Sequence, residues 1–250
     1  MTKIAIIQRP PVLLDRGATL AKAVQWVAEA AAAGATLIVF PESFIPGYPS
    51  WIWRLAAGRD GAVMGPLHAR LLANAVDVGG GDLAELCEAA RAHQVTLVGS
   101  LICWENYMPL ARYALDAQGV EIYVAPTYDS GDAWLATMRH IALEGRCWVI
   151  GSGTALRAAD IPQDFPARAA LFPEAEDWIN DGDSVVVDPT GKVVVGPLRR
   201  EAGVLYAEID VARVAPSRRT LDVAGHYARA DIFELHVHRA PVIPVRFADG

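Results

Sequence analysis

Lysine is scarce in this sequence, which has it only at Lys3, Lys22 and Lys192. Basic residues as a class form no long run; the pairs at 199–200 and 218–219 fit a solvated face, and the net charge is −7. Proteins that bind nucleic acid gather Lys and Arg on one face or along one helix. The sequence therefore predicts no nucleic-acid partner.

Long apolar runs are also lacking, although 53% of the residues are hydrophobic and the mean hydropathy is +0.23. A membrane-spanning helix needs about 20 consecutive apolar residues. The Ala-rich stretch 28–35 is too short and holds Glu29 and Gly34. We expect no membrane partner, and we expect the excess apolar surface to meet another subunit.

Cysteine is equally sparse, and Cys87, Cys103 and Cys147 have no metal-ligand spacing. The first residues lack the layout of a signal peptide, so we expect a reducing, cytoplasmic setting. No Gly-rich phosphate loop or dinucleotide fingerprint occurs. The sequence predicts neither a cofactor nor a metal.

The hydrophobic pattern predicts an α/β fold. An apolar run at 3–8, a helical pattern at 17–33 and a second apolar run at 36–40 form a strand–helix–strand unit. Further strands are expected at 95–102, 121–125, 147–150 and 204–209, a hairpin at 184–195, and helices at 68–76, 82–93, 109–117 and 133–146. Because no repeat or linker interrupts the pattern, we expect one domain over residues 1–250, with a tail from about 226 to 250 that packs on a neighbouring subunit.

Two side chains that could take part in a reaction follow predicted strands directly. Cys103 follows the strand at 95–102, where backbone N–H groups can stabilise a thiolate. Glu42 follows the strand at 36–40, at the strand end where open α/β sheets bind ligands. Each has a plainer interpretation taken alone, since cysteines commonly fill cores and a loop glutamate commonly meets solvent.

Several longer motifs decide between these interpretations. Together they resemble the signatures of the nitrilase superfamily of carbon–nitrogen hydrolases, in its true-nitrilase branch. The motifs lie at residues 34–49 around Glu42, 101–109 around Cys103, 125–130, 137–146, 188–191 and 225–229. The resemblance implies a four-layer α-β-β-α sandwich, no cofactor, and a homodimer or larger homo-oligomer.

The resemblance also implies roles for individual residues. Cys103 would be the nucleophile that attacks a nitrile, and Glu42 would be its general base. The product would be a carboxylic acid and ammonia, formed through a thioimidate and an acyl intermediate on Cys103. The residues expected to line or support the pocket are Tyr48, Trp104, Glu105, Thr127 and Trp134.

The sequence departs from the family between its two main motifs. The family has a lysine there, on a loop after an extra pair of strands, but here only residues 43–102 separate the motifs and they hold no lysine. We interpret this as an internal deletion that joins two strands near Ser100 and could leave the sandwich two strands short. Arg139 could supply positive charge but could not act as an acid.

Three hypotheses stay open at this stage. The first is a nitrilase-like hydrolase acting on a small-molecule nitrile. The alternative is a catalytically impaired homologue that serves as an assembly or regulatory subunit, and an unstable fragment without function is the third reading. The helices predicted at 109–117 and 133–146, which pair subunits in the family, are present in either case.

Overall fold

The computed structural model describes residues 1–56, 58–98 and 102–238. Its strands are β1 (Thr2–Gln8), β2 (Leu37–Val39), β3 (Thr96–Val98), β4 (Ile122–Thr127), β5 (Trp148–Gly153), β6 (Ala155–Arg157), β7 (Trp178–Val187), β8 (Val193–Arg199) and β9 (Gly203–Ile209). Its α-helices are α1 (Arg16–Ala32), α2 (Gly61–Ala73), α3 (Ala84–Ala92), α4 (Pro109–Asp116), α5 (Asp132–Gly145), α6 (Arg168–Leu171) and α7 (Val214–Arg218). Short 3₁₀ turns are η1 (Ser50–Arg54), η2 (Cys103–Tyr107), η3 (Ala158–Asp160) and η4 (Val211–Arg213).

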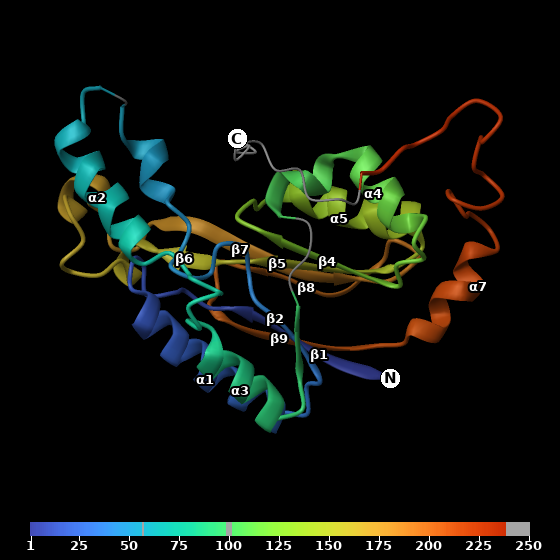
Figure 1. Cartoon of the computed structure of the whole chain (residues 1–250), viewed down its shortest axis with the longest axis horizontal. Helices are drawn as coiled ribbons and strands as arrows, with labels where there is room; N and C mark the ends of the chain where they lie inside the picture. The colour runs from blue at the N-terminus through green and yellow to red at the C-terminus, as the bar shows by residue number, and fades with distance from the viewer. Residues whose placement is uncertain (57, 99–101, 239–250) are drawn as a thin grey trace, which may run out of the picture.

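Two sheets form the centre of the molecule (Figure 1). Sheet A has the order β3-β2-β1-β9, in which β1, β2 and β3 are parallel and β9 is antiparallel. Sheet B has the order β4-β5-β7-β6, with β8 beside β7. The helices α1 and α3 cover the outer face of sheet A, and α4 and α5 cover the outer face of sheet B. The architecture is the α-β-β-α sandwich expected from the sequence.

The alternation of side chains along β1 explains why the sheets pack in layers. Successive side chains of a strand point to opposite faces. Ile4 and Ile6 enter the core between the sheets, where they meet residues such as Val124 and Val186. Ala5 and Ile7 enter the core beneath α1. Because both faces of β1 are apolar, the strand can be buried on both sides, as in other parallel sheets.

Most of the predicted elements are present, with shifted ends. The hairpin is confirmed, with Gly191 at φ 80° in its turn. The predicted start of the helix at 68–76 was wrong, because α2 already begins at Gly61. The strand predicted at 95–102 is described only over Thr96–Val98, and its proposed join near Ser100 lies outside the described residues. In the described part of the chain, no helix combines the length and apolarity that crossing a membrane would require.

Gln8 at the end of β1 ties the two sheets together. Its side chain is fully buried, and its Nε2 donates to the carbonyl oxygens of Leu198 (2.7 Å) and Glu201 (2.8 Å). Its Oε1 accepts from the N–H of Ser184 in β7, at 2.8 Å. One side-chain amide from a strand of sheet A thus pairs with backbone groups of β7, of β8 and of the loop that follows β8.

We expect Gln8→Leu to lower the free energy of unfolding by about 2–3 kcal/mol, because a buried N–H and two carbonyls would lose their partner. Urea denaturation measures the change. Gln118→Leu is the matched control, since Gln118 is exposed and its side-chain amide donates to the carbonyl of Ala114 in the adjacent helix α4. Equal losses in the two variants would contradict a bridging role for Gln8.

Candidate active site

Glu42 and Cys103 emerge from neighbouring parallel strands. Glu42 follows β2, and Cys103 begins η2 shortly after β3. Since β2 and β3 run in the same direction, their carboxyl ends lie at one edge of sheet A. The structure therefore brings together the two side chains that the sequence analysis singled out.

Sheet B supplies the opposite wall at the carboxyl end of β4. The backbone N–H of Tyr128 donates to Glu42 Oε2 at 3.0 Å. The hydroxyl of the buried Thr127 lies 3.8 Å from Cys103 Sγ and accepts from the N–H of Asp129 at 2.8 Å. The pair thus lies where the edges of both sheets meet.

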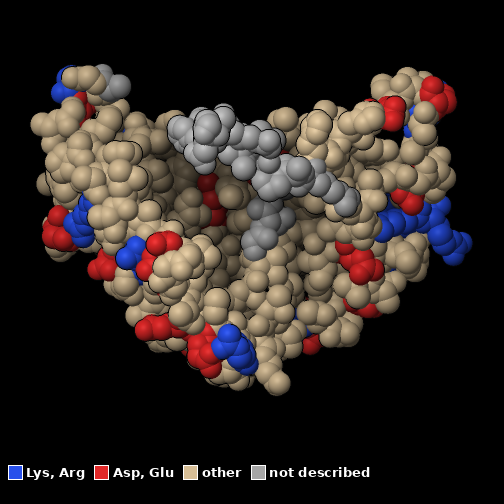
Figure 2. Space-filling model, in the orientation of Figure 1, with Lys and Arg blue, Asp and Glu red and all other residues tan. Residues whose placement is uncertain are grey.

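The resulting pocket has a volume of about 450 Å³, within the range of small-molecule sites. Its lining residues are Glu42, Tyr48, Trp53, Cys103, Trp104, Tyr128 and Asp129. Figure 2 shows acidic side chains inside the hollow on this face, while Lys and Arg lie on the outer parts of the molecule. None of the three lysines is among the lining residues.

The backbone of Cys103 is held in an unusual conformation. Its φ of 51° lies in the left-handed region, which costs a residue other than glycine roughly 1–3 kcal/mol. The buried Asn106 compensates by donating from Nδ2 to the Cys103 carbonyl at 2.7 Å. Asn106 is held in turn by the Tyr123 hydroxyl (2.9 Å) and, through its own carbonyl, by Arg112 (3.0 Å). This buried network orients the thiol toward the pocket.

The electrostatics of the pair suit proton transfer. Burial raises the pKa of the Glu42 carboxyl above its usual range, while hydrogen bonds from the Cys103 thiol and the Tyr128 N–H oppose that rise. Burial also raises the pKa of the Cys103 thiol, as does its contact with Glu42. A neutral thiol therefore rests against a carboxylate of increased basicity, which is the arrangement a general base requires.

The residues expected around the pair occupy different places. Tyr48 lines the pocket and stacks on Tyr128, with ring centroids 4.0 Å apart and planes at 8°. Trp104 also lines it, and its Nε1 donates to Asp129 Oδ2 at 3.2 Å. Glu105 is exposed, accepts from the Ile102 N–H at 2.9 Å, and its negative charge helps to raise the pKa of Glu42.

Trp134 does not line the pocket. It is fully buried in α5, and its ring meets the edge of Tyr107 at a centroid distance of 6.2 Å. Tyr107 donates from its hydroxyl to Asp129 Oδ2 at 2.9 Å. Trp134 thus supports the wall of the pocket from behind, through Tyr107.

The sequence analysis missed three contributors to the site: Trp53, Asp129 and Asn106. Trp53 follows the motif at 34–49, in a stretch that also holds Trp51. Asp129 and Asn106 lie within the motifs at 125–130 and 101–109, which give neither residue a role. The role of Asn106 comes from a contact with a backbone carbonyl three residues away.

The remaining thiols and basic side chains lie elsewhere. Cysteines commonly fill cores, as the buried Cys147 does, but Cys87 is exposed, so that general expectation is wrong for Cys87. Arg139 donates from Nε to the carbonyl of Gly191 at 3.1 Å and does not line the pocket. Among the described residues, no group of three His, Cys, Asp or Glu side chains could hold a metal ion.

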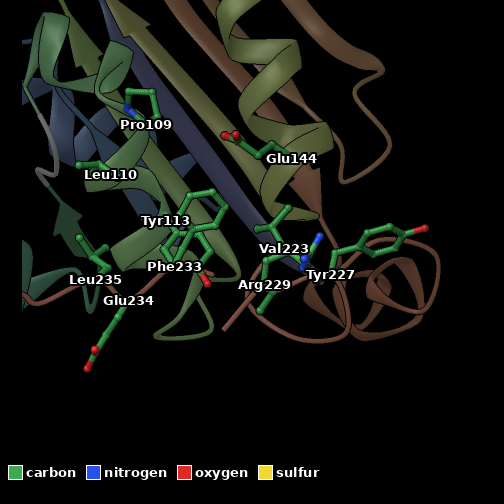
Figure 3. A pocket seen from close by; sticks show the side chains of 11 residues that line it. Pro109, Leu110, Tyr113, Glu144, Val223, Tyr227, Arg229, Phe233, Glu234 and Leu235 are labelled. Carbon is green, nitrogen blue, oxygen red and sulfur yellow. The ribbon is translucent and has the colours of Figure 1, made fainter. Parts of the chain in front are cut away.

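A second cavity, of about 530 Å³, lies beside α4 (Figure 3). Its walls come from Pro109, Leu110 and Tyr113 of α4, from Glu144 at the end of α5, and from residues 223–235 of the C-terminal segment. No cysteine is among its lining residues. This cavity therefore lacks a thiol nucleophile, and the chemistry is expected in the pocket of Cys103.

Comparison with known proteins agrees with this geometry. The model of the carbon–nitrogen hydrolase family matches residues 3–101 and 92–219. The chain belongs to the carbon–nitrogen hydrolase family. Among its curated relatives in that family, an aliphatic nitrilase of Sinorhizobium fredii (strain HH103) is 33% identical, with 96% of this chain and 97% of the relative covered. Nitrilase 3 of Arabidopsis thaliana is 32% identical, with 98% of this chain and 89% of the relative covered.

Solved structures support the fold of this carbon–nitrogen hydrolase. A carbon–nitrogen hydrolase from Helicobacter pylori G27 superposes with a TM-score of 0.65 at 16% identity, covering 92% of this chain and 96% of the other. Nit3 of Saccharomyces cerevisiae, a member of branch 10 of the nitrilase superfamily, gives 0.62 at 15% identity, with 91% and 96% covered. At these identities the likeness establishes the sandwich and leaves the chemistry to the site itself.

In a Cys87→Ser background, we expect iodoacetamide to alkylate Cys103 at a rate that rises with pH, with a midpoint above the usual range of thiols. Burial and the Glu42 carboxylate both raise the pKa of this thiol, and the thiolate is the reactive form. Glu42→Gln removes the negative charge, so it should move the midpoint to lower pH. Peptide mass spectrometry follows the reaction, with buried Cys147 as the unreactive internal control; an unchanged midpoint would exclude a thiol–carboxylate pair.

Proposed function

We propose that this carbon–nitrogen hydrolase converts a small nitrile to a carboxylic acid and ammonia. One observation carries the proposal: a thiol and a carboxylate of raised pKa meet at the ends of two adjacent parallel strands, inside a pocket of small-molecule size. The relatives named as nitrilases over nearly the whole chain support the same reaction class.

The reaction begins with proton transfer from Cys103 Sγ to Glu42. The thiolate then adds to the nitrile carbon: a C–S bond forms, one C–N π bond breaks, and the nitrogen takes the proton held by Glu42, which gives a thioimidate and restores the Glu42 carboxylate. A water molecule, deprotonated by Glu42, attacks the same carbon and ammonia leaves. A second water cleaves the resulting thioester, which releases the acid and restores the thiol. The backbone N–H of Trp104 is the donor we assign to the developing negative charge.

The lysine implied by the resemblance has no counterpart in the pocket we propose. The alignment with the Sinorhizobium fredii relative runs over 302 positions, more than this chain has residues, and both segments of the family match include residues 92–101. Both facts support the interpretation that the relatives have an internal segment that this chain lacks. In this interpretation, β3 stands at the place where the relatives have additional strands. Loss of one preorganised charge donor slows such reactions by about 10²–10³. We therefore expect slow turnover.

Incubation with an activated aromatic nitrile should give ammonia and a covalent adduct on the intact protein, because Cys103 forms the bond that is hydrolysed later. Both signals should vanish in Cys103→Ala and persist in Cys87→Ala, whose thiol is exposed and remote from the pocket. In Glu42→Gln we expect ammonia release to fall by at least 10²-fold, as for loss of a general base. Intact-mass spectrometry and an ammonia assay measure the two steps.

The combination of signals separates the possible functions. An adduct without ammonia would mean that Cys103 attacks and that later steps need the absent segment. Neither signal, from a protein that melts cooperatively, would refute the hydrolase and favour the assembly or regulatory subunit.

For the assembly of the chain, we infer a homodimer through α4 and α5. Large apolar side chains on these helices and directly before α4 are exposed: Met108 by 55%, Leu110 by 63% and Leu143 by 42%. An apolar face of this kind is typical of subunit interfaces. The interface would also cover the second cavity beside α4, and it applies to either function.

We expect the chain to be a dimer or larger in light scattering, and Leu110→Asp to shift it toward the monomer, because a charge would be buried in the apolar interface. Leu72→Asp is the matched control: Leu72 is exposed by 61% on α2, far from α4 (Figure 1). A monomeric parent protein, or equal effects of the two substitutions, would refute the interface.

A further inference from the structure

The walls of the Cys103 pocket carry charge of one sign. Among the described residues, its lining includes two carboxylates, Glu42 and Asp129, and no Lys, Arg or His. Glu105 adds a third negative charge, which raises the pKa of the Glu42 carboxyl further. Arg54 does not line the pocket, although its positive charge acts to lower the pKa of the Tyr128 hydroxyl. Its guanidinium is held by other partners: Nη1 donates to the Leu171 carbonyl at 2.8 Å, and the group lies over the Phe172 ring. The described residues thus leave the pocket acidic.

Asp129 is fixed on the wall opposite Glu42's strand. Its Oδ2 accepts from Trp104 Nε1 (3.2 Å) and from the Tyr107 hydroxyl (2.9 Å), and its Oδ1 accepts from the Ser130 N–H (2.8 Å). All three donors are neutral, so none compensates the charge of the carboxylate. The mechanism has no use for this residue, although it stands two positions from Thr127, whose hydroxyl lies 3.8 Å from the nucleophile.

Aromatic rings complete the pocket. Tyr48 and Tyr128 form a stacked pair, while Trp53 and Trp104 are exposed by 72% and 68%. The faces of such rings attract cations, most strongly when the cation is shielded from water, and Trp is the best of them. Four aromatic rings surround one cavity together with a carboxylate whose hydrogen-bond donors are all neutral. This combination is suited to bind quaternary and primary ammonium groups.

We propose that the nitriles this pocket prefers carry a positively charged ammonium group, which lies between Asp129 and the aromatic rings while the nitrile carbon faces Cys103. The inference rests on the proposed function, because it names the substrate class of the same site. The ammonium group would also bring a positive charge into a pocket whose described lining residues carry none.

The test compares (cyanopropyl)trimethylammonium with its neutral isostere, in which a tert-butyl group replaces the trimethylammonium group. At low salt we expect kcat/KM to be about tenfold higher for the cation, a factor that corresponds to one charge pair in a half-exposed site. The ratio should approach one at about 1 M salt, where the screening length is near 3 Å. An analogue with a carboxylate in place of the ammonium group should be the poorest of the three.

Asp129→Asn identifies the residue responsible. The amide keeps an oxygen that can accept from Trp104 and Tyr107 but removes the charge, so the ratio of cation to isostere should fall about tenfold. Glu121→Gln is the matched control, since it removes the same charge from the opposite end of β4 and should leave the ratio unchanged. Equal kcat/KM for cation and isostere in the parent protein, or an unchanged ratio in Asp129→Asn, would overturn the inference.

A binding readout separates this inference from the proposed function. The two compounds are also compared as protectants of Cys103 against iodoacetamide, and the cation should protect at about tenfold lower concentration. If no nitrile releases ammonia but the cation still protects selectively, the proposed hydrolysis fails and the preference for cations stands. If neutral nitriles are hydrolysed and protection is equal, hydrolysis stands and the preference fails.

Discussion

The hydrogen bond from the Tyr128 N–H to Glu42 is the contact on which the site depends, because its two partners come from different sheets. Glu42 is fixed by β2 in sheet A, and Tyr128 follows β4 in sheet B. Any change in the spacing of the sheets therefore alters the environment of the general base. The apolar core between the sheets and the Gln8 bridge maintain that spacing, which connects distant packing to the basicity of one carboxylate.

The nucleophile is held by a different means. Cys103 has a left-handed backbone, and the energy needed for it is offset by a buried polar network centred on Asn106. Arg112 carries that network to Glu144 of α5, with an Nε–Oε2 distance of 2.8 Å. The helices α4 and α5 therefore have two roles in this chain: they cover sheet B, and they fix the position of the thiol. An interface built on their outer face would make the same support more rigid.

The sequence was sufficient to predict the helices and strands and the pair of Glu42 and Cys103. It was insufficient to predict which residues form the wall of the pocket around that pair. β1, α1 and the hairpin have strong periodicity or turn chemistry, so their existence could be predicted although their ends shifted. Glu42 and Cys103 were candidates because each follows a strand, and the resemblance of the surrounding motifs to the nitrilase superfamily then favoured both as the central pair. Asp129 and Asn106 could not be assigned roles, since each acts through a contact set by tertiary packing. Whether Trp134 lines the pocket or supports it from behind could not be predicted for a related reason: an aromatic residue near a motif can face the core or the ligand, and periodicity does not distinguish them.

The scarcity of lysine and the acidity of the pocket are two aspects of one electrostatic problem. A hydrolase of this type has to stabilise negative charge that develops on the substrate, and a cationic side chain normally does so in a water-poor site. In this pocket the charged lining residues are carboxylates, which oppose a second anion nearby. Backbone N–H groups remain as donors, but the described lining residues supply no positive charge. A substrate that carries its own cation would supply that charge and would be retained by the same carboxylates, so that binding and charge stabilisation would both depend on the ligand.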